Sequence, residues 1–292
     1  MRYGVIIGVL VSCIGAVVFS SIRLPTDPPQ RMDGCAAIPS FLRSAPRDAA
    51  LDLTQRGFRG VRMISATQPS WVLQKPSWVT VPMVASARDD RGTLYLVAAP
   101  HVRFTPSEAE AYQFLYIIDS KSGELRKFAR LPIRPPHARN PFGGIGITYD
   151  CETHAVYVGH VGGSTPQNQY GGVVRITREG TVRTVMKNRD VLGVAVIRHG
   201  RRRYLYYGDA RQSRLMRIRL WGDDHILTPP EEVIRFDGDT RAVALRVRRE
   251  GTLRVTLAPF RYSLVTDSIA QKEYLLLRWR NGKWSTSRSS EL

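Results

Sequence analysis

Short apolar runs, rich in Val, Ile, Leu and Tyr, recur along residues 61–287 and are separated by Gly, Asp, Asn and Pro. A typical case is Met83–Arg88, which is followed by the polar turn 89–92 and by a second apolar run at 93–97. Runs of this length and composition, bounded by turn-forming residues, are typical of β-strands. No segment keeps a helical apolar period over several turns, so the pattern predicts an all-β domain.

The apolar runs are grouped in quartets that recur about fifty residues apart. Four quartets span residues 83–131, 144–186, 193–236 and 242–284, and residues 61–81 supply strands for a fifth. A sixth requires a contribution from residues 24–50, which are rich in Pro and Arg and are interpreted as a linker. Repeated four-stranded units are typical of propeller blades. We therefore expect a five- or six-bladed β-propeller over residues 51–292.

The amino terminus predicts export. Residues 4–22 contain no charge, and Arg2 and Arg23 flank them. A helix of this length, at ~1.5 Å per residue, just crosses a hydrocarbon core of ~30 Å. Residues 1–23 are interpreted as a signal-anchor helix or a cleavable signal peptide, and the length of the run favours the anchor because signal-peptide apolar regions are shorter. Either interpretation places the rest of the chain in the periplasm or outside the cell, anchored to the membrane in the first case.

Composition excludes several classes of protein. The chain has 292 residues, of which 43% are hydrophobic and 23% charged, which excludes a disordered chain, collagen, a coiled coil and a polytopic membrane protein. Lys and Arg number 43 against 25 Asp and Glu, for a formal charge of +18, so an anionic surface is a candidate partner. Arg201, Arg202 and Arg203 form a basic cluster in a predicted turn, which either touches anionic lipid or is simply solvated. Export argues against nucleic acid.

Three cysteines leave the redox state open. Cys13 lies in the apolar segment, at the end of a stretch that matches a bacterial lipobox but is followed by apolar residues where lipoproteins have a polar tether. Cys35 and Cys151 lie outside that segment, in a compartment that permits disulfides. They either pair, fastening the amino-terminal segment to the domain, or stay as two free thiols. The spacing supports no zinc site.

One quartet resembles a known repeat. Residues 192–196, 205–210 and 214–218 resemble an NHL-type repeat, as found in the SMP-30/gluconolactonase and strictosidine-synthase-like propellers, and residues 144–149, 156–159 and 172–176 repeat the pattern. The resemblance implies a propeller over residues 83–287 and a function among lactonases, esterases, lyases or binding scaffolds. Metal-dependent members place an Asn just before the Gly that opens an inner strand. Here Leu192 and Gly143 stand there, which argues against lactonase activity.

Long loops are expected on one face of the ring. In such a blade, the loops after second strands and the loops between blades share one face, and here they are long: 100–113, 160–171 and 259–272. The turns expected on the other face, such as 89–92, are short. Long loops on a rigid scaffold usually form the binding face, although loops also lengthen without any ligand.

Four residues on this long-loop face are the candidate ligand-binding set. His101 and His160 follow second strands, His137 lies in a blade connection, and Asp209 takes the place of His160 in the next unit. Imidazole and carboxylate suit a divalent metal, so His101, His160 and Asp209 are weak candidates for metal ligands. The alternative is a set of surface residues with no common partner. Ala98 and Leu257 occupy the equivalent positions in other units, so the ring of ligands is incomplete.

The sequence favours an exported, membrane-anchored β-propeller that binds a ligand or protein partner through its long-loop face. The alternative is a metal-dependent lactonase, esterase or lyase of the group that the repeat resembles. No catalytic residue is assigned, and whether the protein is an enzyme stays open. A divalent metal is the only candidate cofactor.

Overall fold

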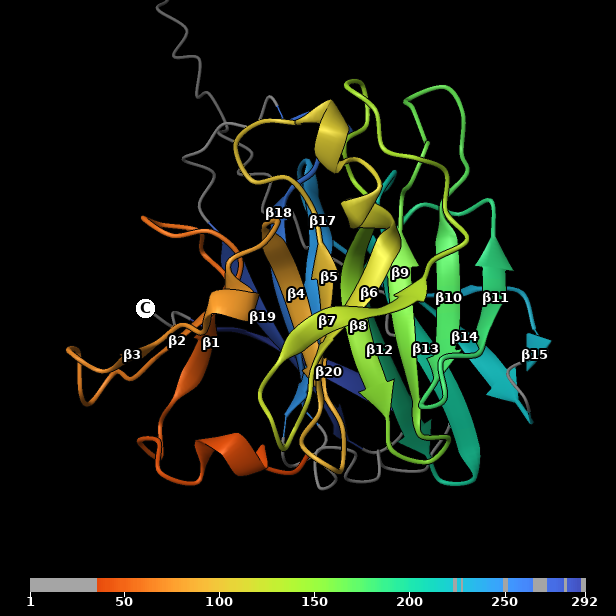
Figure 1. Cartoon of the computed structure of the whole chain (residues 1–292). Helices are drawn as coiled ribbons and strands as arrows, with labels where there is room; N and C mark the ends of the chain where they lie inside the picture. Colours follow the sequence, from red (N-terminus) through yellow and green to blue (C-terminus); the bar gives the residue numbers. More distant parts are fainter. Residues whose placement is uncertain are drawn as a thin grey trace, which may run out of the picture.

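The computed structural model describes residues 36–222, 225–226, 228–248, 252–264, 272–280 and 283–289. These residues form five antiparallel sheets arranged as the blades of a propeller, so the predicted fold is confirmed with five blades (Figure 1). The predicted membrane segment, residues 4–22, lies outside the described residues. Within the described ranges, no helix has the length and apolar character needed to cross a bilayer.

In the complete blades the strands follow chain order outward from the axis. The second blade contains β4 (Met83–Arg88), β5 (Leu94–Ala98), β6 (Phe114–Ile118) and β7 (Leu125–Arg130), and the third contains β8 (Gly144–Asp150), β9 (Ala155–His160), β10 (Gly172–Thr177) and β11 (Val182–Lys187). The fourth contains β12 (Val191–His199), β13 (Arg202–Asp209), β14 (Arg214–Trp221), β15 (His225–Ile226) and β16 (Glu231–Arg235). The fifth contains β17 (Thr240–Arg248), β18 (Thr252–Pro259), β19 (Glu273–Arg280) and β20 (Lys283–Ser289).

Two blades depart from the expected quartet. The first contains three short strands, β1 (Ala50–Asp52), β2 (Arg62–Ile64) and β3 (Val72–Leu73), and β1 begins at the end of the segment interpreted as a linker. The fourth has a fifth strand because the chain turns back at Gly222, where φ is +47°, and β15 pairs with the end of β14. A two-residue strand carries too little apolar alternation to be recognised in sequence.

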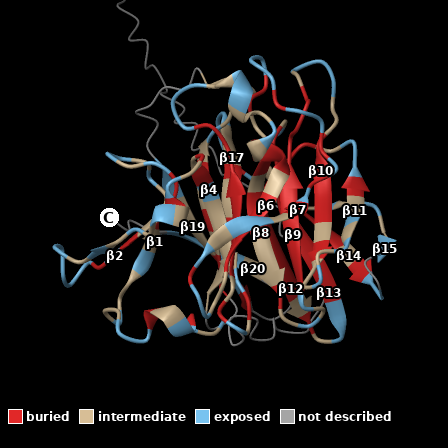
Figure 2. Ribbon diagram, viewed as in Figure 1, coloured by how far each residue is buried: buried red, intermediate tan, exposed pale blue. Residues whose placement is uncertain are grey.

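Hydrophobic clusters join successive blades. Trp78 and Met83 belong to the cluster between the first and second blades, and Leu115 and Val158 to the cluster between the second and third. Similar clusters lie between the third and fourth blades and between the fourth and fifth, and the inner strands are correspondingly buried (Figure 2). Between the first and fifth blades, the described residues form no such cluster.

Every complete blade has a β-bulge near the start of its inner strand. The register against the second strand shifts between Met83 and Ala85 in β4 and between Gly144 and Gly146 in β8. It shifts likewise at the start of β12 and of β17. A bulge bends its strand and re-aims the extra side chain. The bulged residues are Val84, Ile145, the pair Leu192 and Gly193, and Val243.

Glycine lets the inner strands meet closely at these bulges. A Cβ on Gly146 would lie 2.1 Å from the carbonyl oxygen of Leu192, and one on Gly193 would lie 2.8 Å from the Cα of Ala244. Both distances are shorter than any real contact of a Cβ. The close approach of β8, β12 and β17 therefore requires glycine at both positions.

The amino-terminal segment crosses the short-turn end of the propeller, which we define as the end formed by turns 89–92, 119–124, 151–154 and 199–202 (Figure 1). The backbone N–H of Ala37 donates to the carbonyl of Asp89 at 3.0 Å, and that of Phe41 donates to the carbonyl of Ser120 at 3.2 Å. Cys151 is disulfide-bonded, so the alternative of a free thiol there is wrong. The other two cysteines lie outside the described residues, and the pairing with Cys35 stays a prediction.

Replacing Gly146 by Ala should destabilise the domain because the new methyl group overlaps the Leu192 carbonyl. We expect a loss of about 3 kcal/mol in the free energy of unfolding, measured with urea. Gly238→Ala is the control: Gly238 has open space around it and only a positive φ of +67°, which costs about 1–2 kcal/mol for a non-glycine residue. Equal losses for the two variants would contradict the close approach at the axis.

Candidate functional site

The long loops predicted from the sequence share the end of the propeller opposite the short turns (Figure 1). They join β5 to β6, join β9 to β10 and follow β18. The first of them contains two 3-10 turns, Pro106–Glu108 and Ala111–Gln113. The long-loop face is therefore built from loops that differ in length and conformation on a common scaffold.

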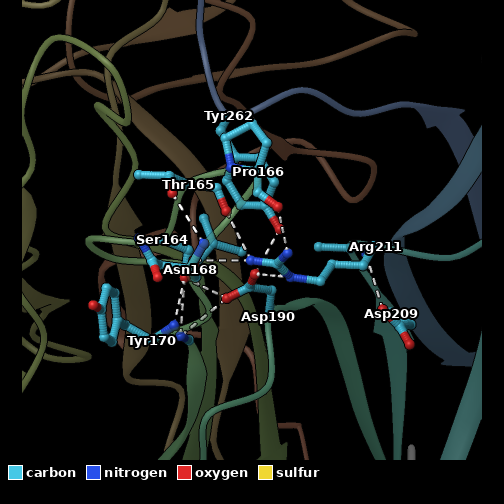
Figure 3. A network of polar contacts seen from close by, with 12 residues as sticks. Ser164, Thr165, Pro166, Asn168, Tyr170, Asp190, Asp209, Arg211 and Tyr262 are labelled. Atoms are coloured by element: carbon cyan, nitrogen blue, oxygen red, sulfur yellow. Dashed lines mark hydrogen bonds and ion pairs between the residues drawn. The ribbon is translucent and has the colours of Figure 1, made fainter.

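A buried carboxylate organises this face. Asp190 lies in the connection between β11 and β12 and is 1% exposed. Its Oδ1 accepts hydrogen bonds from the Ser164 hydroxyl and from the backbone N–H of Gly171, the latter at 3.0 Å. Its Oδ2 accepts from Arg211 Nε at 2.8 Å and from the Tyr262 hydroxyl at 2.5 Å (Figure 3). Four donors from three loops thus satisfy one buried charge, which offsets the cost of its desolvation.

Arg211 carries the opposite charge and holds the 160–171 loop. Its Nη1 donates to the carbonyl of Pro166, and its Nη2 donates to the carbonyls of Thr165 and Asn168, each at 2.8 Å (Figure 3). Together with the bond to Asp190, four of the five guanidinium N–H groups have acceptors. We name this set of contacts around Asp190 and Arg211 the loop clamp. Its charges hold loops of the third, fourth and fifth blades together.

The hydroxyls of Ser164 and Tyr262 in the loop clamp both donate hydrogen bonds to Asp190. Ser164 is fully buried, and its Oγ accepts from the backbone N–H groups of Tyr170 and Gly171 while it donates to Asp190. Burial, followed by the hydrogen bond to Asp190, raises the pKa of Tyr262, so its phenol keeps the proton that it donates. Ser164 is therefore a loop-fixing residue, because no substrate can reach its oxygen in this arrangement.

Beside the loop clamp lies an apolar centre. It is formed by residues at the ends of inner and second strands in the third, fourth and fifth blades: Val161, Leu192 and Ala210, which are buried, and Phe142, Ile145, Val243, Phe260 and Tyr262, which are partly exposed. The Phe260 ring lies 5.7 Å from the Phe142 ring and 5.3 Å from the Tyr262 ring, centroid to centroid. Tyr262 therefore belongs to both features.

The bulges of the inner strands supply this centre. Ile145, Leu192 and Val243 are the bulged residues of β8, β12 and β17. Val84 occupies the equivalent bulge of β4 and is 39% exposed. In the third, fourth and fifth blades, the same backbone irregularity thus directs an apolar side chain into this centre.

The His160 side chain is buried rather than exposed on the long-loop face. It is the last residue of β9, it is 4% exposed, and Gly144 and Gly172 lie opposite it on the two neighbouring strands. A Cβ on Gly172 would come within 3.1 Å of its Nε2, so glycine makes room for the imidazole. Within the described part of the chain, its Nδ1 has no hydrogen-bond partner. Burial lowers the pKa of His160 to about 4, so the ring is neutral at pH 7.

The other three candidate residues lie apart from it. His101 and His137 are exposed, and the Nδ1 of His137 accepts from the backbone N–H of Arg139 at 3.2 Å. Asp209 is the last residue of β13, where it accepts from Arg214 Nε at 2.9 Å. The described residues contain no group of three or more His, Cys, Asp or Glu side chains placed to hold a metal ion. The described residues therefore do not bring these four side chains together as one metal site.

No family model matches the chain, and no curated protein matches it in sequence. Its structure is similar to an oxidoreductase described as a glucose dehydrogenase from Thermus thermophilus, with a TM-score of 0.50 and 15% identity, covering 78% of this chain and 74% of that chain. It is also similar to a candidate gluconolactonase, with a TM-score of 0.49 and 14% identity, covering 87% of this chain and 97% of that chain. A third similar structure is that of the calcium-binding protein regucalcin from Agrobacterium tumefaciens. Its TM-score is 0.48 at 12% identity, and the match covers 88% of this chain and 83% of that chain.

At such low identity, the likeness to the Thermus structure shows the β-propeller fold alone. The β-propeller that the repeat predicts is confirmed at that level. Activity has to be argued from the residues of this chain.

Removing the charge of Asp190 should loosen the long-loop face. In Asp190→Asn the Arg211 guanidinium loses its counter-charge, and breaking such a buried pair costs about 3–5 kcal/mol. Urea unfolding should show this loss, and amide hydrogen exchange should become faster in residues 161–171. Asp239→Asn is the matched control, because Asp239 contacts Arg241 at 2.8 Å but is 68% exposed and should cost less than about 1 kcal/mol. Equal effects of the two variants would show that the loop clamp is not stabilising.

His160 should make the fold sensitive to acid. Its pKa is about 4 when folded and about 6.5 when unfolded, so the unfolded chain binds the proton first as the pH falls. Stability is therefore lost between about pH 6.5 and pH 4, by about 3 kcal/mol in total at 1.36 kcal/mol per pKa unit.

His160→Gln, which stays neutral, should remove this part of the pH dependence of urea unfolding. The control is His137→Gln, which removes an exposed histidine from the same face. Parallel pH profiles for the native protein and His160→Gln would contradict the assignment.

Proposed function

We propose that this protein is an exported, membrane-anchored β-propeller that binds a ligand or partner through the apolar centre of its long-loop face. The observation that carries the proposal is the set of bulged side chains, Ile145, Leu192 and Val243, gathered at the axis beside partly exposed aromatic rings. The charged groups of the loop clamp are engaged with one another, so apolar contact is the chemistry left at this centre. An apolar concentration framed by satisfied polar groups is typical of binding surfaces.

Two features support export and anchoring. Residues 4–22 are uncharged and long enough for a membrane helix. The disulfide of Cys151 is of a kind that persists in oxidising compartments outside the cytoplasm.

Site-specific photo-crosslinking in cells tests the binding role. A benzoylphenylalanine in place of Phe260 should yield a discrete adduct, identified by mass spectrometry of the labelled peptide, because Phe260 lies in the apolar centre. The same group in place of Trp221, which is 59% exposed at the end of β14, is the control and should yield none. Adding Phe142→Ser should weaken the adduct at position 260, since the two rings are in contact. Equal adducts at positions 260 and 221 would contradict the proposal.

The alternative, a metal-dependent lactonase, esterase or lyase, requires a divalent ion near His101, His137, His160 and Asp209. A purely binding role predicts the same metal content in the native protein and in a His101→Ala/His160→Ala double variant, measured by plasma mass spectrometry after growth with zinc and calcium. Circular dichroism checks that the double variant keeps its β-structure. Stoichiometric metal in the native protein that disappears from the folded variant would favour the enzyme over the scaffold.

A further inference from the structure

The amino-terminal segment is fixed to one end of the propeller. The backbone N–H groups of Ala37 and Phe41 donate hydrogen bonds to turns 89–92 and 119–124. The Phe41 ring packs edge-on against Trp78, with the ring centroids 5.9 Å apart. A Cβ on Gly92 would lie 2.8 Å from the Cα of Pro39, so this turn and the segment are in close contact. The chain therefore enters the domain at the short-turn end, opposite the long-loop face (Figure 1).

A covalent bond adds to this attachment. Cys151 lies in the turn between β8 and β9, at the same end, and it is disulfide-bonded. Both other cysteines of the chain, Cys13 and Cys35, precede residue 36. The pairing with Cys35 that the sequence predicts would tie the amino-terminal segment to the short-turn end of the third blade.

The tips of this end carry basic side chains that have no acidic partner among the described residues. Five exposed basic side chains lie there, and none of them forms an ion pair or a side-chain hydrogen bond with another described residue: Arg43, Arg91, Lys121, Arg201 and Arg202. Arg43 directly follows the 3-10 turn Ser40–Leu42 that packs on turn 119–124.

The acidic residues of this end are mostly engaged. Asp89 is fully buried and accepts from the backbone of its own turn, as does Asp119 at its turn. Asp90 pairs with Arg178, Asp150 is buried 3.4 Å from Arg203, and Glu152 lies 3.1 Å from Arg198. Glu124 lies 3.9 Å from Lys75, while Glu179 is exposed. The groups at the tips that are free to meet a partner are therefore predominantly cationic.

We propose that the short-turn end is a membrane-facing surface that rests on anionic lipid headgroups and turns the long-loop face away from the bilayer. The inference rests on the proposed anchoring of residues 4–22. At ~3.1 Å per residue for a Pro-rich extended segment, residues 23–36 reach about 40 Å, which keeps the domain near the bilayer without fixing its orientation. The cationic tips supply the second contact, because Lys and Arg near an anionic membrane surface are attracted to it. The apolar centre then faces outward, where a partner can reach it.

Hydrogen exchange of the full-length protein in nanodiscs tests this orientation. One set of discs contains phosphatidylcholine only, and the other contains about one-third phosphatidylglycerol. We expect amides of turns 89–92, 119–124 and 199–202 to exchange severalfold more slowly in the anionic discs, while loops 100–113 and 161–171 exchange equally in both. Raising the salt concentration from about 0.1 to about 0.5 M should abolish the difference, because the attraction is screened.

Charge reversal identifies the surface. Arg201→Glu/Arg202→Glu should lose the protection in anionic discs, whereas Arg103→Glu/Arg139→Glu, an equal change among exposed residues of the long-loop face, should keep it. If the first variant does not fold, the salt dependence of hydrogen exchange in the native protein tests the proposal instead. Equal exchange of the short turns in both discs, or protection of the long loops instead, would overturn this proposal alone. Failure of the protein to co-elute with either disc would overturn the membrane anchor as well.

Discussion

The close approach of the inner strands at the axis determines the rest of this structure. Gly146 and Gly193 allow β8, β12 and β17 to meet with no side chain between them. Each of these strands begins with a bulge, which bends it and turns one apolar residue toward the axis. Larger residues at the two glycine positions would push the blades apart, and the strand ends that carry the long loops would no longer converge.

Convergence explains why a charged network can exist on the long-loop face. Asp190, Arg211 and Tyr262 come from three connections, and only the convergence of their blades brings them within hydrogen-bond distance of one another. Because the carboxylate and the guanidinium satisfy each other and the backbone of the 160–171 loop, they stiffen the rim rather than attract a charged ligand. A stiff rim around an apolar centre reduces the conformational entropy that the loops of this face would lose on binding a partner.

Local signals in the sequence are enough to predict the fold. Alternation and turn residues located the strands, with β4 matching its predicted bounds, and loop lengths identified the long-loop face. The loop clamp cannot be predicted in this way, because Asp190 and Tyr262 are far apart in the chain and no local pattern pairs residues across blades. For His160 a signal existed and was missed: glycine stands opposite it on both neighbouring strands, which makes room for a buried ring. Its position at a strand end alone suggested exposure.

The disulfide at Cys151 changes how the molecule bears mechanical load. The first blade has three short strands, and the described residues pack it through a hydrophobic cluster against the second blade only. A force pulling on the amino terminus of an unlinked chain would peel this blade off first, strand by strand. The predicted bond between Cys35 and Cys151 would pass this tension directly into the third blade and bypass the first two. It would thereby shield the weakest blade from the drag that acts on a domain tethered at its amino terminus.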